Sequence, residues 1–223
     1  MTRYLSNMKW ILLSLDPLIL KVQNWASVLA HYLIPGFSPI MLRMKNGDRL
    51  LIPHSYVFEA IAETLLMDVY HFSGEQPEVV VDIGASIGDF SILASSKGQR
   101  RVYAFEPDRN TFEFLKKNIS LNNRTEIEAS NHPADGNVLR DVLTKQRVDH
   151  IDFLKIDCEG CEYDVLLKCS DADLSSVMKI AMEIHSSVEC RKSDIIMRLR
   201  KSGFVISQSK RFGQGHYVYA WRV

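Results

Sequence analysis

Short apolar runs alternate with amphipathic segments from residue 78 onward in this 223-residue chain. The runs are rich in valine and isoleucine and are apolar on both faces, which is typical of strands buried in a parallel sheet. Helical patterns follow at residues 108–123, 160–169 and 188–202. The alternation predicts a doubly wound α/β sheet that binds its ligand at the carboxyl ends of the strands. In chain order the five runs read EVVVDIG, RVYAFEP, TEIEAS, IDFLKID and VMKIAMEIH.

Two further runs, FVISQS and HYVYAWRV, close the chain. The turn between them contains Gly213 and Gly215 and is too short for a helical crossover. Because only antiparallel strands can be joined so directly, we expect the last strand to run antiparallel to its neighbour. This places one Rossmann-like domain at residues 77–223.

The first 76 residues have a different pattern. We divide them into an N-terminal helical extension, residues 1–36, and a β-hairpin with one helix, residues 37–76. The extension predicts two short amphipathic helices, at 4–14 and 18–33, because Asp16-Pro17 interrupts the apolar run before it is long enough to cross a membrane. We expect them to pack on the domain; a lid, a dimer surface and a peripheral membrane contact through residues 4–33 are alternatives.

The hairpin is predicted in PIMLRMKNGDRLLIP, where Asn46-Gly47 favours a tight turn between two apolar runs. Ser55 stands where it can cap the next helix, and apolar residues then recur at steps of three and four up to Val69. We expect Gly74 and Pro77 to end that helix.

Charge and cysteine content restrict the partners and the compartment. The chain has 27 Lys+Arg and 27 Asp+Glu, and this balance argues against a nucleic-acid partner, since phosphates usually select a basic surface. Cys158 and Cys161 form a CxxC pair, but no second pair stands at zinc-ribbon spacing. We therefore expect the cysteines to pack as small apolar residues in a protein of the reducing cytoplasm.

Polar residues directly follow four of the predicted strands. Singly, each has a structural explanation, such as capping a helix or ending a strand in solvent. Together they meet at one edge of the sheet, and this convergence predicts a functional site. The residues are Asp82, Gly84 and Gly88 after the first strand, Glu106, Pro107 and Asp108 after the second, Asp157, Glu159 and Gly160 after the fourth, and Glu183 and His185 after the fifth.

The spacing of these residues indicates a nucleoside ligand. Gly84 and Gly88 let a turn of the backbone approach a ligand at a helix N-terminus. Glu106 lies eighteen residues after Gly88, where a carboxylate can accept both hydroxyls of a ribose. The dinucleotide pattern requires a glycine where this chain has Ser86, and an acid at Asp82 would repel a pyrophosphate. Asp82 suits a cationic ligand instead, such as S-adenosylmethionine (SAM).

Three longer stretches resemble the successive motifs of the FkbM family of SAM-dependent methyltransferases. The resemblance covers about residues 37–205, and its most discriminating part is D-x-E-G-x-E, from Asp157 to Glu162. It implies a class I methyltransferase sheet of about seven strands, and O-methylation of a hydroxyl on a sugar, polyketide or other small molecule. The stretches are VVVDIGASIGDFSILAS, VYAFEPDRNTFEFLKKNISLNN and IDFLKIDCEGCEYDVLL, and the later AMEIH resembles the family's fifth strand.

The resemblance also implies roles for individual residues in binding SAM. Residues 130–150 are shorter than the family's usual segment after the third strand, and Asn131 and His132 are the candidates there for contacts with adenine. Glu106 would hold the ribose hydroxyls and Asp157 would lie near the methyl-transfer centre. The methionine and ribose part of SAM would be lined by Asp82, Gly84, Ala85 and Gly88, with Pro107 and Asp108 beside the adenine.

A hydroxyl has to lose its proton as it attacks a methyl group, so the site needs a base. His185 is our candidate, because histidine titrates near 6.5 and a neighbouring Glu183 or Asp157 would raise its pKa toward neutrality. We expect the reaction to need no metal. As an alternative, Asp157, Glu159 and Glu183 could hold Mg²⁺, whereas Glu162 is expected to point elsewhere from within its helix.

Two other functions are compatible with parts of the pattern. A nicotinamide-dependent oxidoreductase would share the glycine turn and the acid for ribose, but it leaves D-x-E-G-x-E unexplained. A non-catalytic SAM-binding protein would keep Glu106 and the turn, yet it would have no need of His185. The expected methyl acceptor is a hydroxyl of a small molecule or glycan.

Overall fold

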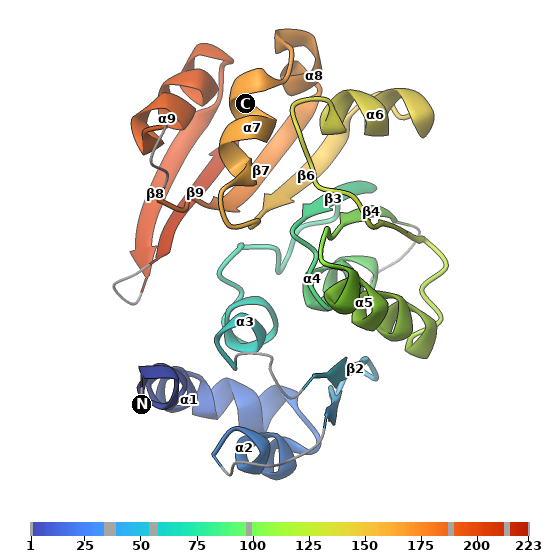
Figure 1. Cartoon of the computed structure of the whole chain (residues 1–223), viewed down its shortest axis with the longest axis vertical. Helices are drawn as coiled ribbons and strands as arrows, with labels where there is room; N and C mark the ends of the chain where they lie inside the picture. Colours follow the sequence, from blue (N-terminus) through green and yellow to red (C-terminus); the bar gives the residue numbers. More distant parts are fainter. Residues whose placement is uncertain are drawn as a thin grey trace.

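A seven-stranded mixed sheet forms the centre of the computed structural model, which describes residues 2–33, 39–53, 58–96, 100–186, 190–211 and 215–222 (Figure 1). The strand order is β5-β4-β3-β6-β7-β9-β8. Strands β3 to β7 are parallel to one another, and β9 is antiparallel to both β7 and β8. The predicted sheet and its antiparallel last strand are therefore confirmed. The bounds are β3 Val79–Ile83, β4 Arg101–Phe105, β5 Ile127–Ser130, β6 Ile151–Ile156, β7 Val177–Glu183, β8 Val205–Arg211 and β9 Gly215–Trp221.

Helices cover both faces of this sheet, because successive strand side chains point to opposite sides. On β3, Val79, Val81 and Ile83 pack in the core formed with α6, α7, α8 and α9. Val80 belongs to the core that includes α4, α5 and the N-terminal helices. The helices are α4 Asp89–Ser95, α5 Arg109–Leu121, α6 Val138–Lys145, α7 Cys161–Lys168, α8 Asp171–Ser175 and α9 Lys192–Lys201.

The N-terminal helices differ from the prediction at Pro17. Helix α1, Thr2–Lys21, continues through Pro17, and α2 follows at Trp25–Leu33. Leu18 and Val22 are fully buried in the core shared with α4 and α5, and this packing holds the helix together where proline removes a backbone hydrogen bond. Packing on the domain is thus the arrangement observed. Within the described part of the chain, no helix combines the length and apolarity needed to cross a membrane.

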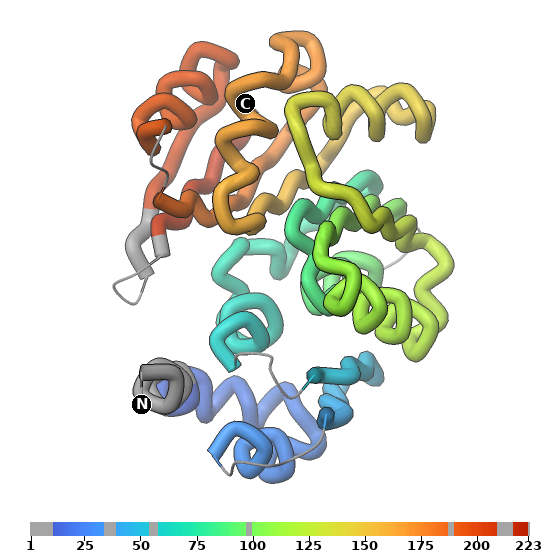
Figure 2. Tube along the Cα trace, viewed as in Figure 1, coloured from blue at the N-terminus to red at the C-terminus, as the bar shows by residue number. Residues whose placement is uncertain are grey.

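The hairpin and the segment after it connect these helices to the sheet. Strands β1 Ile40–Arg43 and β2 Arg49–Ile52 are antiparallel, and Gly47 in their turn has φ +98°. The predicted single helix is instead a short helix, α3 Phe58–Ile61, followed by a π-helical turn, η1 Ala62–Leu66; Ser55 lies outside the described residues. Figure 2 shows residues 58–75 between the N-terminal segment and the sheet.

Candidate functional site

The predicted convergence of strand ends is confirmed. Strands β4, β3, β6 and β7 are adjacent and parallel, so the residues that follow them lie at one edge of the sheet. Gly84 follows β3, Glu106 follows β4 and Asp157 follows β6, while Glu183 is the last residue of β7. The site therefore contains groups from four strands.

The two glycines of the turn after β3 are required by their positive φ angles and by neighbouring protein atoms that leave no room for a Cβ. Gly84 has φ +75°, and a Cβ atom there would lie 1.8 Å from the carbonyl oxygen of Asp157. Gly88 has φ +89°, and its Cβ would meet the Leu115 side chain at 2.5 Å. The space that we expected to admit a ligand is thus partly filled by the neighbouring loop and by α5. Gly84 lets this turn lie against the Asp157 backbone, and Gly88 lets it lie against Leu115 of α5.

Asp82 is placed differently from the expectation that it faces a cationic ligand. Its side chain is fully buried, and Oδ1 lies 3.1 Å from the Nζ of Lys155. Ser91 donates a hydrogen bond to Oδ2 (2.6 Å), and Lys155 also donates to the carbonyl oxygen of Gly84 (2.8 Å). Because Asp82 and Lys155 are register partners on β3 and β6, the charge of Asp82 is neutralised within the sheet. Lys155 also connects this pair to the turn, through its bond to Gly84.

Glu106 has the geometry of a clamp for two hydroxyls. The backbone N–H of Ser86 donates to Oε2 (2.9 Å) and that of Asp108 donates to Oε1 (2.8 Å). A carboxylate oxygen has two lone pairs, so each oxygen can accept one further hydroxyl, as a ribose requires. Burial raises the pKa of Glu106, although these two backbone bonds oppose the shift. The residues present fit the nucleoside part of SAM.

The other candidates near Glu106 shape the loop. Asp108 caps α5 by accepting from the Thr111 backbone N–H (2.8 Å), and Asn131 donates to the carbonyl oxygens of Glu106 (2.8 Å) and Pro107 (3.0 Å). His132 is exposed. These contacts hold the β4 and β5 loops together where an adenine would lie.

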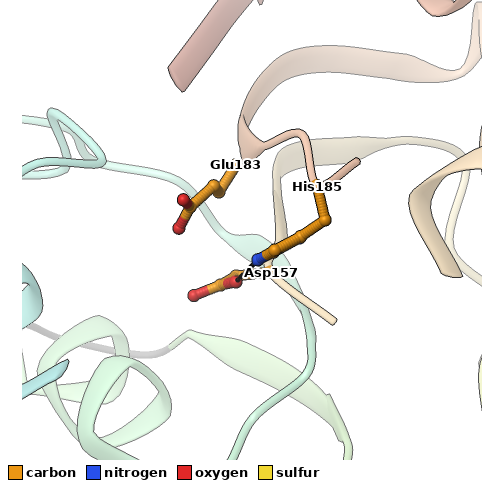
Figure 3. A group of neighbouring side chains, drawn as sticks. All are labelled: Asp157, Glu183 and His185. Carbon is orange, nitrogen blue, oxygen red and sulfur yellow. Dashed lines mark ion pairs between the residues drawn. The ribbon is translucent and has the colours of Figure 1, made fainter. Parts of the chain in front are cut away.

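Asp157, Glu183 and His185 form the second group at this edge (Figure 3). One ligand-type atom from each lies within 4.8 Å of the other two. Tyr70 donates a hydrogen bond to Oδ2 of Asp157 (2.7 Å), and the Nε2 of His185 lies 3.7 Å from Oδ1. Burial, followed by the charge of Asp157, raises the pKa of Glu183 to about 7.

Glu162 contacts His185, which corrects the expectation that it points elsewhere. The Glu162 side chain is fully buried, accepts from the His185 backbone N–H (2.6 Å), and lies 3.3 Å from Nδ1 of the ring. The interaction with Glu162 raises the pKa of His185 to about 9, against the opposing effect of burial. The ring is therefore an imidazolium at neutral pH, with protons on both nitrogens.

That charge bears on whether the group holds a metal. The spacing of Asp157, Glu183 and His185 is compatible with a divalent cation. A metal would have to displace a proton from the His185 ring, because a protonated ring has no lone pair on either nitrogen. The imidazolium itself supplies positive charge to the two carboxylates.

Sequence reasoning missed three side chains next to this group. Glu63, on η1, is buried and accepts a hydrogen bond from the Tyr217 hydroxyl, and Tyr217 is the register partner of Glu183. Burial raises the pKa of Glu63 to about 8, and burial also raises that of Tyr70 well above its usual value. A lone glutamate in the apolar stretch IAETLL was the signal available for Glu63.

The cysteines also differ from the prediction. Cys158 and Cys161 form a disulfide, with Cα atoms 5.5 Å apart, whereas Cys169 is a buried thiol outside it. The i, i+3 spacing at the start of α7 brings the two Cα atoms within bridging range. A disulfide at this pair does not support the expectation of a reducing compartment.

Comparison with known proteins agrees with the geometry. Residues 54–159 match the TRM5/TYW2 methyltransferase domain, and residues 120–206 match the methyltransferase FkbM domain. The hexuronic acid methyltransferase AglP of Haloferax volcanii is 26% identical over 144 residues, which are 52% of this chain and 59% of AglP. The AMB antimetabolite synthetase AmbE of Pseudomonas aeruginosa is 33% identical over 114 residues, 48% of this chain and 5% of AmbE. The chain thus spans less than two thirds of these relatives.

Solved structures agree on the fold. The N-terminal domain of human METTL16 in complex with SAH, the demethylated product of SAM, has a TM-score of 0.54 at 16% identity and covers 78% of this chain and 75% of that one. At this identity the likeness concerns the fold, which is that of class I methyltransferases. Taken with the motifs at the strand ends and the match of residues 120–206, it makes the chain similar to FkbM-type, SAM-dependent methyltransferases.

Proposed function

We propose that this protein transfers the methyl group of SAM to a hydroxyl of a small molecule or sugar. The observation that carries the proposal is the pairing of two groups at one sheet edge. Glu106, after β4, offers two carboxylate oxygens suited to a ribose. The Asp157–Glu183–His185 group lies at the ends of β6 and β7, on the other side of β3. The similarity to AglP, a hexuronic acid methyltransferase, favours a glycan acceptor.

Bound SAM supplies an electrophilic methyl group on a sulfonium, and the protein has to align the acceptor with it. Glu106 would hold the ribose, and the turn from Gly84 to Gly88 would support the methionine part. Asp82 is neutralised by Lys155, so Asp157 is the carboxylate placed to face the sulfonium charge. These assignments concern binding and orientation.

The proton of the acceptor hydroxyl needs a base, and we assign that role to Glu183 in place of His185. Its pKa of about 7 leaves a large ionised fraction at neutral pH, whereas His185 is already protonated. Glu183 would accept the hydroxyl proton of the acceptor, and bound SAM would supply the methyl group that replaces it. The Nε2–H of His185 would donate to the same oxygen and stabilise its developing negative charge.

Two measurements test this function. Calorimetric titration with SAM, SAH and NAD should give binding of the first two and none of NAD; binding of NAD alone would support an oxidoreductase. Incubation with SAM and a panel of sugars and small polyols should then release SAH and yield a methyl ether. Binding of SAM without turnover across the panel would support a non-catalytic SAM-binding protein.

A further inference from the structure

Glu162 is a fully buried carboxylate that connects the loops after β6 and β7. Its Oε2 accepts from the backbone N–H of Gly160 (2.8 Å), and its Oε1 accepts from the backbone N–H of His185 (2.6 Å). The same Oε1 lies 3.3 Å from the Nδ1 of His185. One side chain thus contacts the loop before α7, the backbone after β7 and the imidazole ring.

The contacts on the other side of the ring are longer. Nε2 of His185 lies 3.7 Å from Asp157 and 3.5 Å from Glu159, both at or beyond the limit of a hydrogen bond. Tyr163, on α7, donates to the carbonyl oxygen of His185 (2.8 Å). The backbone of His185 is therefore fixed by α7 and Nδ1 faces the Glu162 carboxylate at ion-pair distance, while Nε2 faces Asp157 and Glu159 at the edge of the sheet.

We propose that Glu162 is a positioning residue, which holds the ring of His185 against α7 so that its Nε2–H donates to the acceptor oxygen. This inference rests on the proposed function. Glu162 suits the role because it is in the first turn of α7, where the helix dipole favours a negative charge. Its burial also excludes water from competing for Nδ1–H.

The charges around the ring support the same conclusion. Four carboxylates face His185: Glu162 from α7, Asp157 and Glu159 from the loop after β6, and Glu183 from β7. Glu162 has the largest effect on the pKa of His185. Burial tends to raise the pKa of Glu162 itself, but its bonds to His185 and to the backbone outweigh burial and lower it.

Substitution of Glu162 by Gln and by Asp tests the proposal. Gln keeps the shape and removes the charge beside Nδ1, and its single amide oxygen can accept from one of the two backbone N–H groups. Glu113→Gln is the matched control, because Glu113 lies on α5 away from the site and its side chain is half exposed beside Lys116. The readouts are the SAM dissociation constant, turnover with an acceptor, and the NMR titration of the His185 ring in each protein.

We expect Glu162→Gln to bind SAM within about twofold of the wild type while kcat falls by about tenfold or more, a loss typical of a misplaced catalytic donor. The His185 pKa should move from about 9 toward 6.5. Relative to Glu162→Gln, Glu162→Asp should regain part of the lost kcat and part of the lost His185 pKa shift. Glu113→Gln should keep kcat within about threefold of the wild type. Turnover and ring titration unchanged in a folded Glu162→Gln variant would overturn the proposal.

The NMR titration separates this inference from the proposed function. The titration needs no acceptor. If the protein binds SAM without turnover, the methyltransferase assignment is refuted, but the titration still shows whether Glu162 holds the ring. A His185 pKa near 6.5 in the wild type would overturn the positioning role by itself. If Glu162→Gln fails to fold, Glu162→Asp carries the same comparison.

Discussion

Replacing Glu63 with Gln should stabilise the protein above neutral pH. The Glu63 side chain is buried on η1, and burial raises its pKa from 4.5 to about 8. Nearby Glu183 and Asp157 act in the same direction, while the bond from Tyr217 opposes it. The native state therefore binds this proton more tightly than the unfolded chain does. The stability linked to Glu63 is full below pH 4.5, falls as pH rises, and is lost by about pH 8.

The size of the effect follows from these two values. At pH 7, about 2.5 units above the unfolded pKa of 4.5, Glu63 is ionised in the unfolded chain but still protonated in the folded protein. Ionisation stabilises the unfolded chain by about 1.4 kcal/mol for each of these units. Glu63 then costs roughly 3 kcal/mol relative to a neutral side chain of the same shape. A glutamine has no charge to bury, and its amide oxygen can still accept from Tyr217.

The assay is urea denaturation of the wild type and Glu63→Gln at pH 5, 7 and 8. We expect nearly equal stabilities at pH 5 and a gap in favour of the variant that grows to on the order of 3 kcal/mol at pH 7 and above. Glu78→Gln, at an exposed glutamate, controls for the loss of one negative charge. If Glu63→Gln is less stable than the wild type by the same amount at every pH, the buried group is not protonated and the reasoning is refuted.

Three further predictions concern the site. The pH profile of kcat/KM should be bell-shaped, rising near pH 7 as Glu183 loses its proton and falling near pH 9 as His185 loses its own; a single limb near 6.5 would favour His185 as the base. Gly84→Ala should weaken SAM binding more than tenfold and lower stability by about 2–4 kcal/mol, by calorimetry and thermal melting, because its Cβ meets the Asp157 carbonyl oxygen. Dialysis against EDTA should leave turnover unchanged, since an imidazolium supplies the positive charge; loss that Mg²⁺ restores would assign a metal to this group.

The sheet could be predicted from sequence because each strand is a continuous apolar run with a polar end. Runs of this kind fix which residues lie at the carboxyl edge, so the gathering of Glu106, Asp157, Glu183 and His185 followed from topology alone. Pro17 shows the limit of local rules. The burial of Leu18 and Val22 depends on tertiary contacts with the core, and these override the helix-breaking tendency of proline.

The sequence alone did not predict which side chains from different elements contact one another. Lys155 was read as part of an apolar strand, and its pairing with Asp82 depends on the β3–β6 register, which the sequence does not specify. Glu162 was assigned to a helix correctly, but its direction depends on the rotation of α7 against β7. The same holds for Glu63, whose segment contains a π-helical turn with a different angular period from the predicted helix.

The register of the sheet also decides which acid can face the cofactor. Asp82 is inside β3, where alternation turns its side chain into the layer beneath the sheet edge and Lys155 of the neighbouring strand neutralises it. Asp157 comes one residue after β6 ends, so the alternation no longer directs its side chain, and it lies beside Glu183 and His185. The charge available to a sulfonium therefore comes from the ends of β6 and β7. Substitution of Asp82 should accordingly act through stability and the Gly84 turn, whereas substitution of Asp157 should act on the cofactor directly.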